Sequence, residues 1–262
     1  MTEKSRGMIW LELLSNHAPL MPGLAPSVRV ADSEGIRYIA VVPDPQNHYP
    51  RARNGEVGLI EGWTLAKVIN ETVKADEKQG TPRPIVAVVD VTSQAYGRRE
   101  EAFGIHQALA GSAAAYASAR MAGHPVITLI VGKAMSGAFL AHGYQANELI
   151  ALDDPKVLIH AMGKQSAARI TLRTVEELDR YASKIPPMAY DIKHYSQLGL
   201  LYRLLEVSSA DAPTESDVAL VRQTVGEAIE RAKHSDRTLR NRLGSKNRQA
   251  SLTVREKMRA IW

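Results

Sequence analysis

The chain has 262 residues, 45% of them hydrophobic and 23% charged, and its 33 basic residues exceed its 28 acidic residues by five. This is the size and composition of a soluble globular protein with a substantial core, in one large domain or two small ones. The absence of cysteine excludes a disulfide framework, a thiolate metal site and a cysteine nucleophile, and it fits a reducing compartment.

The basic excess is concentrated near the end of the chain. The basic residues there are Arg231, Lys233, Arg237, Arg240, Arg242, Lys246 and Arg248. No aromatic residue interleaves them, so we expect a solvated basic extension from about residue 234 of a single domain spanning 1–262, and no nucleic-acid partner. The sequence starts without the apolar core of a signal peptide, and no apolar run approaches the ~20 residues that span a bilayer. We therefore expect a cytoplasmic protein without a membrane partner.

The first part of the chain predicts a helix, a β-hairpin and a long loop. Residues 8–14 have an apolar helical pattern, and Val28–Ala31 and Ile36–Val42 flank a turn sequence, as in a hairpin. Residues 43–58 are polar and contain three prolines. A surface loop of this length is often functional.

Helices and buried strands alternate after this loop. Trp63–Lys78 has apolar residues at helical spacing, and Ile85–Val91 is typical of a strand buried on both faces. A polar loop, residues 92–100, follows the strand. An alanine-rich helix is then expected over residues 100–122.

The central stretch, residues 127–152, predicts strand, turn, helix and strand. Ile127–Val131 is apolar and β-branched, Gly132 interrupts it, and Ser136 stands where the N-cap of a short buried helix belongs. Glu148–Leu152 is the next strand. This order predicts a right-handed crossover between parallel strands.

The rest of the chain is less regular, but it still predicts defined elements. They are a short apolar segment at 157–161, a loop at 162–168, a helix with a capping box from Thr174 to about Ser183, a helical segment at 188–198, a strand or helix at 200–207, an amphipathic helix that starts at Thr214, and a terminal helix at 252–261. The whole order predicts an α/β architecture with a twisted, mostly parallel sheet.

Tests for common chemical motifs are mostly negative. The eight histidines include no HExxH pattern, so no metal site is expected. Ser136 lies in AMSGA, which matches a nucleophile elbow only in part, so an N-cap role is favoured over a nucleophile. Lys133 and His142 flank the central turn, where solvent-facing or capping roles are favoured over substrate contact.

Two backbone segments at one edge of the sheet remain as a candidate site. They are the loop after Val91 and the helix start at Gly137, and both follow strands whose carboxyl ends meet where ligands bind in parallel sheets. Free amides from two such loops can stabilise an enolate oxygen, one donor being worth roughly 3–4 kcal/mol. The small residues Gly137 and Ala138 also fit close packing of helix on strand, and spacing alone leaves both interpretations open.

At these two loops the sequence resembles the carboxyltransferase members of the crotonase superfamily, over about residues 58–230. TSQAYG at 92–97 resembles the first oxyanion loop of that family, and GKAMSGA at 132–138 resembles the second. The segments VGKAMSGAFLAHGYQANELIALDD and SKIPPMAYDIKHYSQLGLLYRLLEV are similar to the γ subunit of biotin-independent malonate decarboxylase. The resemblance implies a crotonase-like (ClpP/crotonase) α/β fold of ββα superhelix units, of the carboxyltransferase type.

The resemblance also implies partners and a reaction. A β subunit would supply the other half of an active site at the interface, and the pair would decarboxylate a malonyl thioester to an acetyl thioester and carbon dioxide. The thioester would be carried on the phosphoribosyl-dephospho-coenzyme A group of an acyl carrier δ subunit, which an α acyl-transferase subunit would load. No cofactor would be attached to this chain.

Site residues follow from position in the matching motifs. The catalytic candidates are Ala95, Tyr96, Gly137 and Ala138, and the candidates for substrate or coenzyme binding are Gln94, Gly132, Lys133, Ser136 and Lys164. Ala138 replaces a glycine of the family pattern, and Ser93-Gln94 replaces Pro-Gly. Biotin-dependent relatives hold the biotin urea oxygen in this half of the site, so either this chain or the β subunit would bind the substrate oxyanion.

Two alternative functions remain open. The chain could be a non-catalytic scaffold that completes the active site of the β subunit. It could also be a stand-alone enoyl-coenzyme A hydratase or isomerase, for which Glu100 and Glu101 are the carboxylates near the first loop.

Overall fold

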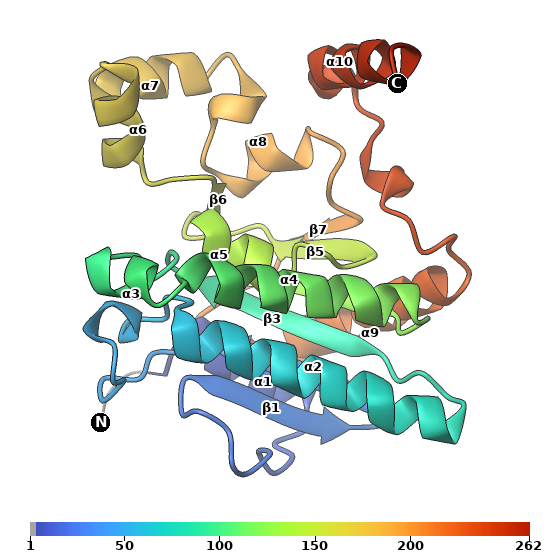
Figure 1. Ribbon diagram of the computed structural model, residues 1–262. Helices are drawn as coiled ribbons and strands as arrows, with labels where there is room; N and C mark the ends of the chain where they lie inside the picture. The colour runs from blue at the N-terminus through green and yellow to red at the C-terminus, as the bar shows by residue number, and fades with distance from the viewer. Residues whose placement is uncertain (1–3) are drawn as a thin grey trace.

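A mixed β-sheet forms the centre of the protein, whose computed structural model describes residues 4–262 (Figure 1). Within these residues the sheet has seven strands in the order β1-β2-β3-β4-β5-β7, and β6 pairs with the end of β4. The strands are β1 Val28–Ser33, β2 Ile36–Val41, β3 Ile85–Val91, β4 Val126–Met135, β5 Glu148–Leu152, β6 Leu158–His160 and β7 Arg203–Leu205. Only the β1–β2 hairpin is antiparallel among the named strand pairs, so the predicted mostly parallel α/β sheet is confirmed.

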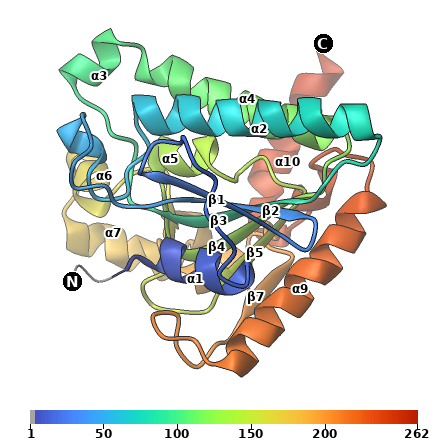
Figure 2. The ribbon, with the colours of Figure 1, turned by 90° about the horizontal axis from the view of Figure 1, so that it is seen from below.

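Helices cover both faces of this sheet, as the view from below shows (Figure 2). Helices α2 (Leu59–Gln79) and α4 (Ile105–Met121) pack together on one face, and α1 (Arg6–Leu14) and α9 (Glu215–Lys233) lie on the other. The remaining helices are α3 Arg98–Ala102, α5 Ser136–Ala141, α6 Lys164–Thr171, α7 Val175–Ala182, α8 Ile192–Ser196 and α10 Gln249–Ala260. Four single 3₁₀ turns occupy Pro50–Ala52, Pro186–Met188, Arg240–Arg242 and Lys246–Arg248.

The apolar runs of β3 and β4 are buried because helices cover the sheet on both sides. Ile85–Val89 and Val126–Val131 are fully buried, as their unbroken apolar pattern predicts. Complete burial of one such side chain contributes roughly 1.5–3 kcal/mol. The centre of the sheet is therefore a rigid platform for the loops at its edge.

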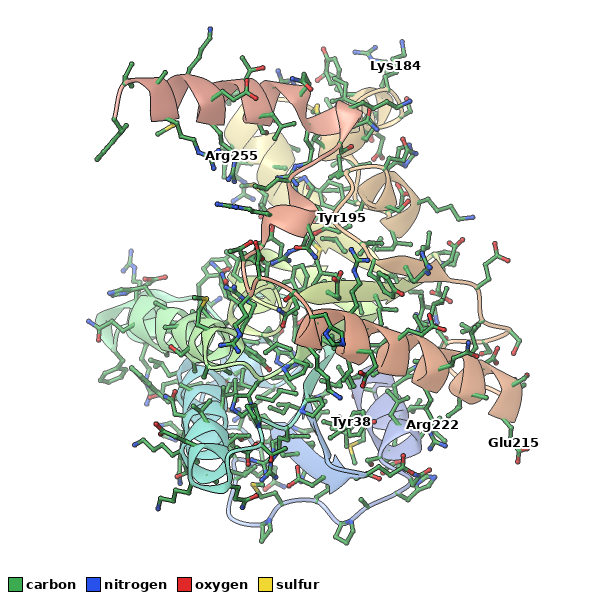
Figure 3. The ribbon with its side chains drawn as sticks, turned by 90° about the vertical axis from the view of Figure 1, so that its right-hand side faces the viewer. Tyr38, Lys184, Tyr195, Glu215, Arg222 and Arg255 are labelled. Atoms are coloured by element: carbon green, nitrogen blue, oxygen red, sulfur yellow. The ribbon has the colours of Figure 1, made fainter. Side chains whose placement is uncertain are left out.

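Helices α6 and α7 stand apart from this main core, which includes Ile192 of α8. Figure 1 shows them above the sheet, beyond β6, and Figure 3 shows Lys184, just after α7, at the opposite end of the molecule from Tyr38 and Arg222. Ala167, Ala168 and Leu178 form a small apolar cluster of their own there. This part of the chain consequently forms a wall above the edge of the sheet.

Close packing of α2 on α4 depends on Gly62. A Cβ atom at this position would lie 2.7 Å from the backbone oxygen of Ala108. We expect Gly62→Ala to lower the free energy of unfolding by about 2 kcal/mol, because two helix backbones must separate to admit the methyl group. Urea denaturation measures the change. Gly226→Ala, on α9 with no atom within 4 Å of the added Cβ, is the control and should not destabilise.

Two predicted helix boundaries are wrong for local reasons. Helix α2 begins at Leu59 rather than Trp63. Its N-cap residue is Gly58, which has no side chain to cap the helix, and the Glu61 carboxylate instead accepts a hydrogen bond from the Gly58 amide (2.9 Å). The single helix expected over 100–122 is two helices, α3 and α4. Gly104 separates them with a left-handed φ of 79°.

The prediction that the central strand ends at Gly132 is also wrong. Strand β4 continues to Met135, because its last three residues pair with β6. Met135 is therefore the N-cap of α5, and Ser136 is its first residue with a φ of 56°. The β3–β4 register shifts between Val89 and Val91 to accommodate the extra length of β4.

Three later expectations need correction. The loop expected at 162–168 contains the start of α6, and only Ile192–Ser196 of the expected segment 188–198 is α-helical. The basic segment is not entirely solvated, since Arg242 is buried and donates a hydrogen bond to the backbone oxygen of Tyr144 (2.9 Å). The capping box at Thr174 is confirmed, and so is the start of an amphipathic helix at Thr214, which also has a capping box.

Candidate active site

Two connected cavities lie where the carboxyl ends of β3 and β4 meet α6 to α8. The lysine cavity, about 520 Å³, is lined by Thr92, Lys133, Met135, Leu158, Gly163, Lys164, Asp179, Ala182, Ser183, Tyr190, Asp191 and His194. The glutamine cavity, about 580 Å³, is lined by Thr92, Ser93, Gln94, Tyr96, Met135, Ser136, Ala161, Met162, Gly163, Ser166, Arg169 and Ile170. They share Thr92, Met135 and Gly163, and together they form one cleft.

Five of the nine residues predicted for the site line this cleft. Lys133 and Lys164 line the lysine cavity. Gln94, Tyr96 and Ser136 line the glutamine cavity. The two predicted loops, about 40 residues apart in the chain, therefore both contribute to this cleft.

The other four predicted residues do not line either cavity, and three of them are buried. Ala95, Gly132 and Ala138 are buried beneath the loops. Gly137 is half-buried and lines a third cavity, of about 310 Å³, that shares Ser136 and Ala161 with the glutamine cavity. A Cβ atom on Gly137 would lie 2.6 Å from Oε1 of Gln94. Because these residues are small, neighbouring backbone segments and side chains can pack closely against the two loops.

Three backbone amides of the two candidate loops are already hydrogen-bonded within this chain. The Gly137 amide donates to Oε1 of Gln94 (2.6 Å), and the Ala95 amide donates to the backbone oxygen of Val57 (2.9 Å). The Tyr96 amide likewise donates to the backbone oxygen of Gln94 (3.0 Å). An oxyanion would have to displace the Gln94 carboxamide to reach the amide of Gly137.

The Gln94 contact fixes the orientation of its carboxamide. Because Oε1 accepts from an N–H group, the two donors on Nε2 point elsewhere. Nε2 makes no hydrogen bond within residues 4–262, and Gln94 lines the glutamine cavity. The Gln94 side chain thus occupies the Gly137 amide and offers the two N–H donors of Nε2 to the cleft in its place.

The long loop at 43–58 supports the first site loop, which explains its length. Val57 forms a parallel bridge with Gln94, and the Val57 amide donates to the backbone oxygen of Ser93 (3.0 Å). The fully buried Glu61 carboxylate accepts hydrogen bonds from Ser27 Oγ (2.5 Å) and Asn47 Nδ2 (2.7 Å). The loop predicted to lie on the surface is in this way anchored to the core.

Gly132 lies where the register between β3 and β4 shifts, and there is no room for a side chain at this position. A Cβ atom there would lie 2.1 Å from Oδ1 of Asp90, and that oxygen accepts a hydrogen bond from the Lys133 amide (3.0 Å). The contact fixes the backbone at Lys133, whose exposed side chain lines the lysine cavity. Asp90 therefore orders the site through Lys133 and does not itself line the cleft.

Both carboxylates of the lysine cavity already have a side-chain partner within this chain. Lys164 Nζ lies 2.6 Å from Asp179 Oδ1, and His194 Nδ1 lies 2.8 Å from Asp191 Oδ2. Lys133 forms no ion pair with any residue in the range 4–262. Lys133 is consequently the cation that this cavity leaves for a ligand.

His142 belongs to the core and not to the site. It is fully buried between the Tyr116 hydroxyl (2.9 Å from Nδ1) and the backbone oxygen of Val88 (3.2 Å from Nε2). Nε2 donates to that oxygen, so Nδ1 accepts from Tyr116. Burial lowers the pKa of His142 to about 4, which keeps the imidazole neutral.

This buried histidine predicts acid sensitivity. The unfolded chain binds a proton near pH 6.5 and the folded chain only near pH 4, so protonation stabilises the unfolded state between these values. We expect the contribution to be present above pH 6.5 and to fall by about 2 kcal/mol on acidification to pH 5. Denaturant titrations at both pH values measure it. His142→Gln, which can keep both hydrogen bonds, should reduce this fall; an unchanged pH dependence would contradict the assignment.

Two groups in the cleft were not identified from the sequence. Tyr190 lies in an irregular segment between the 3₁₀ turn at Pro186–Met188 and α8, and Arg169 lies on α6, one residue beyond the loop expected at 162–168. Tyr190 belongs to the segment 183–207 that resembles the family, but nothing in that segment singles out its side chain, and Arg169 belongs to no quoted motif. Only the folding of α6 to α8 over the sheet edge brings them to the two loops.

The carboxylates named for a hydratase do not line the cleft. Glu100 is buried on α3 and Glu101 is exposed there, and neither borders the lysine or the glutamine cavity. Over residues 4–262, no three His, Asp or Glu side chains are placed to hold a metal ion. No helix in that range is long and apolar enough to cross a membrane.

Comparison with known proteins places the chain among malonate decarboxylases. A family model described as malonate decarboxylase gamma subunit matches residues 52–262. A chain of a Pseudomonas malonate decarboxylase hetero-tetramer, solved in complex with coenzyme A, is 57% identical with a TM-score of 0.94, covering 98% of this chain and 100% of that chain. A chain of the Pseudomonas MdcD-MdcE hetero-dimer is 56% identical with a TM-score of 0.90 over the same shares.

More distant relatives agree with this placement. The malonyl-S-ACP:biotin-protein carboxyltransferase MADD of Malonomonas rubra is 37% identical over 161 residues, which are 60% of this chain and 55% of that protein. The chain thus spans about half the length of that relative. Transcarboxylase 12S has a TM-score of 0.63 at 20% identity, over 87% of this chain and 42% of that one, so the two chains share a fold. The chain belongs to the malonate decarboxylase gamma subunit family.

Proposed function

We propose that this chain is the γ subunit of a biotin-independent malonate decarboxylase, and that it acts with a β subunit on a malonyl thioester. The observation that carries the proposal is the 57% identity to a Pseudomonas malonate decarboxylase chain over 98% of this chain. The related hetero-dimer contains MdcD as the second subunit, which supports a β partner here. The cleft at the sheet edge is the part of this chain that the partner would cover.

The chemistry of the substrate determines what the cleft must provide. Decarboxylation breaks the bond between the α-carbon and the carboxylate, and the electron pair moves into the thioester to form an enolate. Carbon dioxide leaves, and a proton then adds to the α-carbon to give the acetyl thioester. Since negative charge moves from the carboxylate to the thioester oxygen, donors at that oxygen lower the barrier, whereas contacts to the carboxylate mainly bind the substrate.

The glutamine cavity suits the carboxylate of the malonyl group. Gln94 offers its Nε2 donors there, and Arg169, on the same lining, has no ion-pair partner within the described chain. A guanidinium and an amide together fit the two oxygens of a carboxylate. This assignment gives Gln94 and Arg169 a role in selecting malonyl over acetyl groups.

The enolate oxygen requires donors that are not already hydrogen-bonded within this chain. The Gly137 and Ala95 amides already donate hydrogen bonds within this chain. Side chains of this chain and donors of the β subunit would therefore stabilise the enolate oxygen together. Lys133 adds positive charge beside the cleft, which favours the anionic substrate and the developing enolate. Tyr96, with half of its surface exposed at the mouth, and Ser136 would line the entrance for the thioester arm.

The carrier arm and the remaining subunits belong to the same proposal. The acyl group would be carried on a phosphoribosyl-dephospho-coenzyme A group of a δ subunit, and an α subunit would load it, in the cytoplasm. The coenzyme A bound in the related hetero-tetramer supports a coenzyme A-like arm. In this arrangement the chain itself attaches no cofactor.

The test is turnover by the assembled subunits. The chain co-purified with its β subunit should convert malonyl-loaded acyl carrier to the acetyl form with release of carbon dioxide, and either subunit alone should not. Mass spectrometry of the carrier measures both acyl forms. An assembled pair without turnover would overturn the proposal, and hydration of enoyl-coenzyme A by this chain alone would favour the hydratase.

A further inference from the structure

The hydroxyl group of Tyr190 lies in the cleft without a partner. The side chain is only 8% exposed, it lines the lysine cavity, and its oxygen makes no hydrogen bond within residues 4–262. Buried hydroxyl groups are normally hydrogen-bonded, because leaving one unpaired costs free energy. An unpartnered hydroxyl beside a cavity therefore points to a ligand atom that completes it.

The position of this hydroxyl is fixed before any ligand arrives. The backbone oxygen of Tyr190 accepts a hydrogen bond from the Ile159 amide of β6 (2.8 Å). Its ring stacks on His160, with centroids 3.9 Å apart and an interplanar angle of 11°. Lys164 Nζ lies 5.4 Å from the centroid of the same ring. A donor held in this way needs little reorganisation to bind a developing charge.

The surroundings make Tyr190 a donor that lacks an acceptor. Burial and the negative charge of Asp179 both raise the pKa of Tyr190, so the phenol keeps its proton at neutral pH. The carboxylates that line the cavity, Asp179 and Asp191, already pair with Lys164 and His194. The two uncommitted groups, Tyr190 and Lys133, are both donors, and the missing partner is thus an anionic or carbonyl oxygen.

Resting on the proposed function, we propose that the Tyr190 hydroxyl donates a hydrogen bond to the thioester oxygen of the malonyl group as it becomes the enolate oxygen. Lys133 adds its charge beside that oxygen. The hydroxyl keeps its proton throughout, and no bond to Tyr190 forms or breaks. The carboxylate of the same malonyl group then points into the glutamine cavity, which adjoins this one through Thr92, Met135 and Gly163.

The test is Tyr190→Phe in the assembled complex with the β subunit. The substitution keeps the ring on His160 and removes only the hydroxyl. We expect kcat for malonyl-loaded acyl carrier to fall about 100-fold, with KM within about threefold of wild type, as for the loss of one donor to a transition-state oxygen. The Tm of the variant should equal or exceed that of wild type, because the hydroxyl has no partner to lose.

Tyr195 supplies the matched control. Its hydroxyl is also buried without a partner within the described residues, but Tyr195 lines a different cavity, of about 310 Å³, which shares Ser136 and Ala161 with the glutamine cavity and no residue with the lysine cavity. Figure 3 shows Tyr195 near the middle of the molecule. Tyr195→Phe should keep kcat, KM and Tm. A Tyr190→Phe complex with wild-type kcat overturns the inference, and so does a fall in kcat accompanied by a lower Tm or lost assembly. A wild-type complex that does not turn over overturns the proposed function itself.

Discussion

Gln94→Glu is expected to lower kcat/KM for the malonyl thioester about 100-fold, mainly by raising KM. The glutamate keeps an oxygen for the Gly137 amide, which lies 2.6 Å from Oε1 in the present structure. It replaces the two donors on Nε2 with a negatively charged oxygen that faces the malonyl carboxylate. Loss of a charge-assisted hydrogen bond together with like-charge repulsion accounts for an effect of this size. Steady-state kinetics of the assembled complex measures it.

Gln107→Glu is the control for the added charge. Gln107 is exposed on α4, outside the residues that line the cleft, so this variant should keep wild-type kinetics. Size-exclusion chromatography should show that both variants assemble with the β subunit. If Gln94→Glu behaves like Gln107→Glu, the side chain serves only to occupy the Gly137 amide, and the scaffold interpretation of this chain gains support.

Arg6→Met is expected to lower the free energy of unfolding by about 3 kcal/mol. Arg6 is 7% exposed and connects three distant segments: its guanidinium lies 2.6 Å from Asp211 and 2.8 Å from Asp154, and it donates to the backbone oxygen of Val131 (3.1 Å). Removal of one partner from a buried ion pair leaves the other charges uncompensated, which is more costly than the net value of the pair. Urea denaturation of the purified chain measures the loss.

Lys4→Met is the matched control, two residues before Arg6 and just outside the start of α1. Its ion pair with Glu12 (2.7 Å) is largely exposed, so the loss should be at most about 1 kcal/mol. Acid should weaken the Arg6 network as well. Hydrogen bonds from Arg6 and Lys156 hold the pKa of Asp211 well below its ordinary value, so this contribution is present above about pH 4 and is lost below it. Equal losses in Arg6→Met and Lys4→Met would contradict the network.

Local signals in the sequence were enough for most of the fold. The apolar runs at 85–91 and 148–152 are strands, and the capping residues at Thr174 and Thr214 start helices, because both patterns act over a few neighbouring residues. Consecutive parallel strands place their carboxyl ends at one edge, so the approximate position of the cleft also followed. The family motifs in the two loops then indicated the class of reaction.

Tertiary structure decided which groups in the cleft are available to a substrate. The Gly137 amide is occupied by Gln94, 43 residues earlier in the chain, and no local pattern could indicate that contact. The β3–β4 register shift beside Gly132 and the position of Tyr190 depend in the same way on packing between distant segments. Hydrophobic periodicity and capping residues reflect interactions between residues close together in the sequence. The partners of a buried amide or hydroxyl depend instead on which distant segments of the chain pack together.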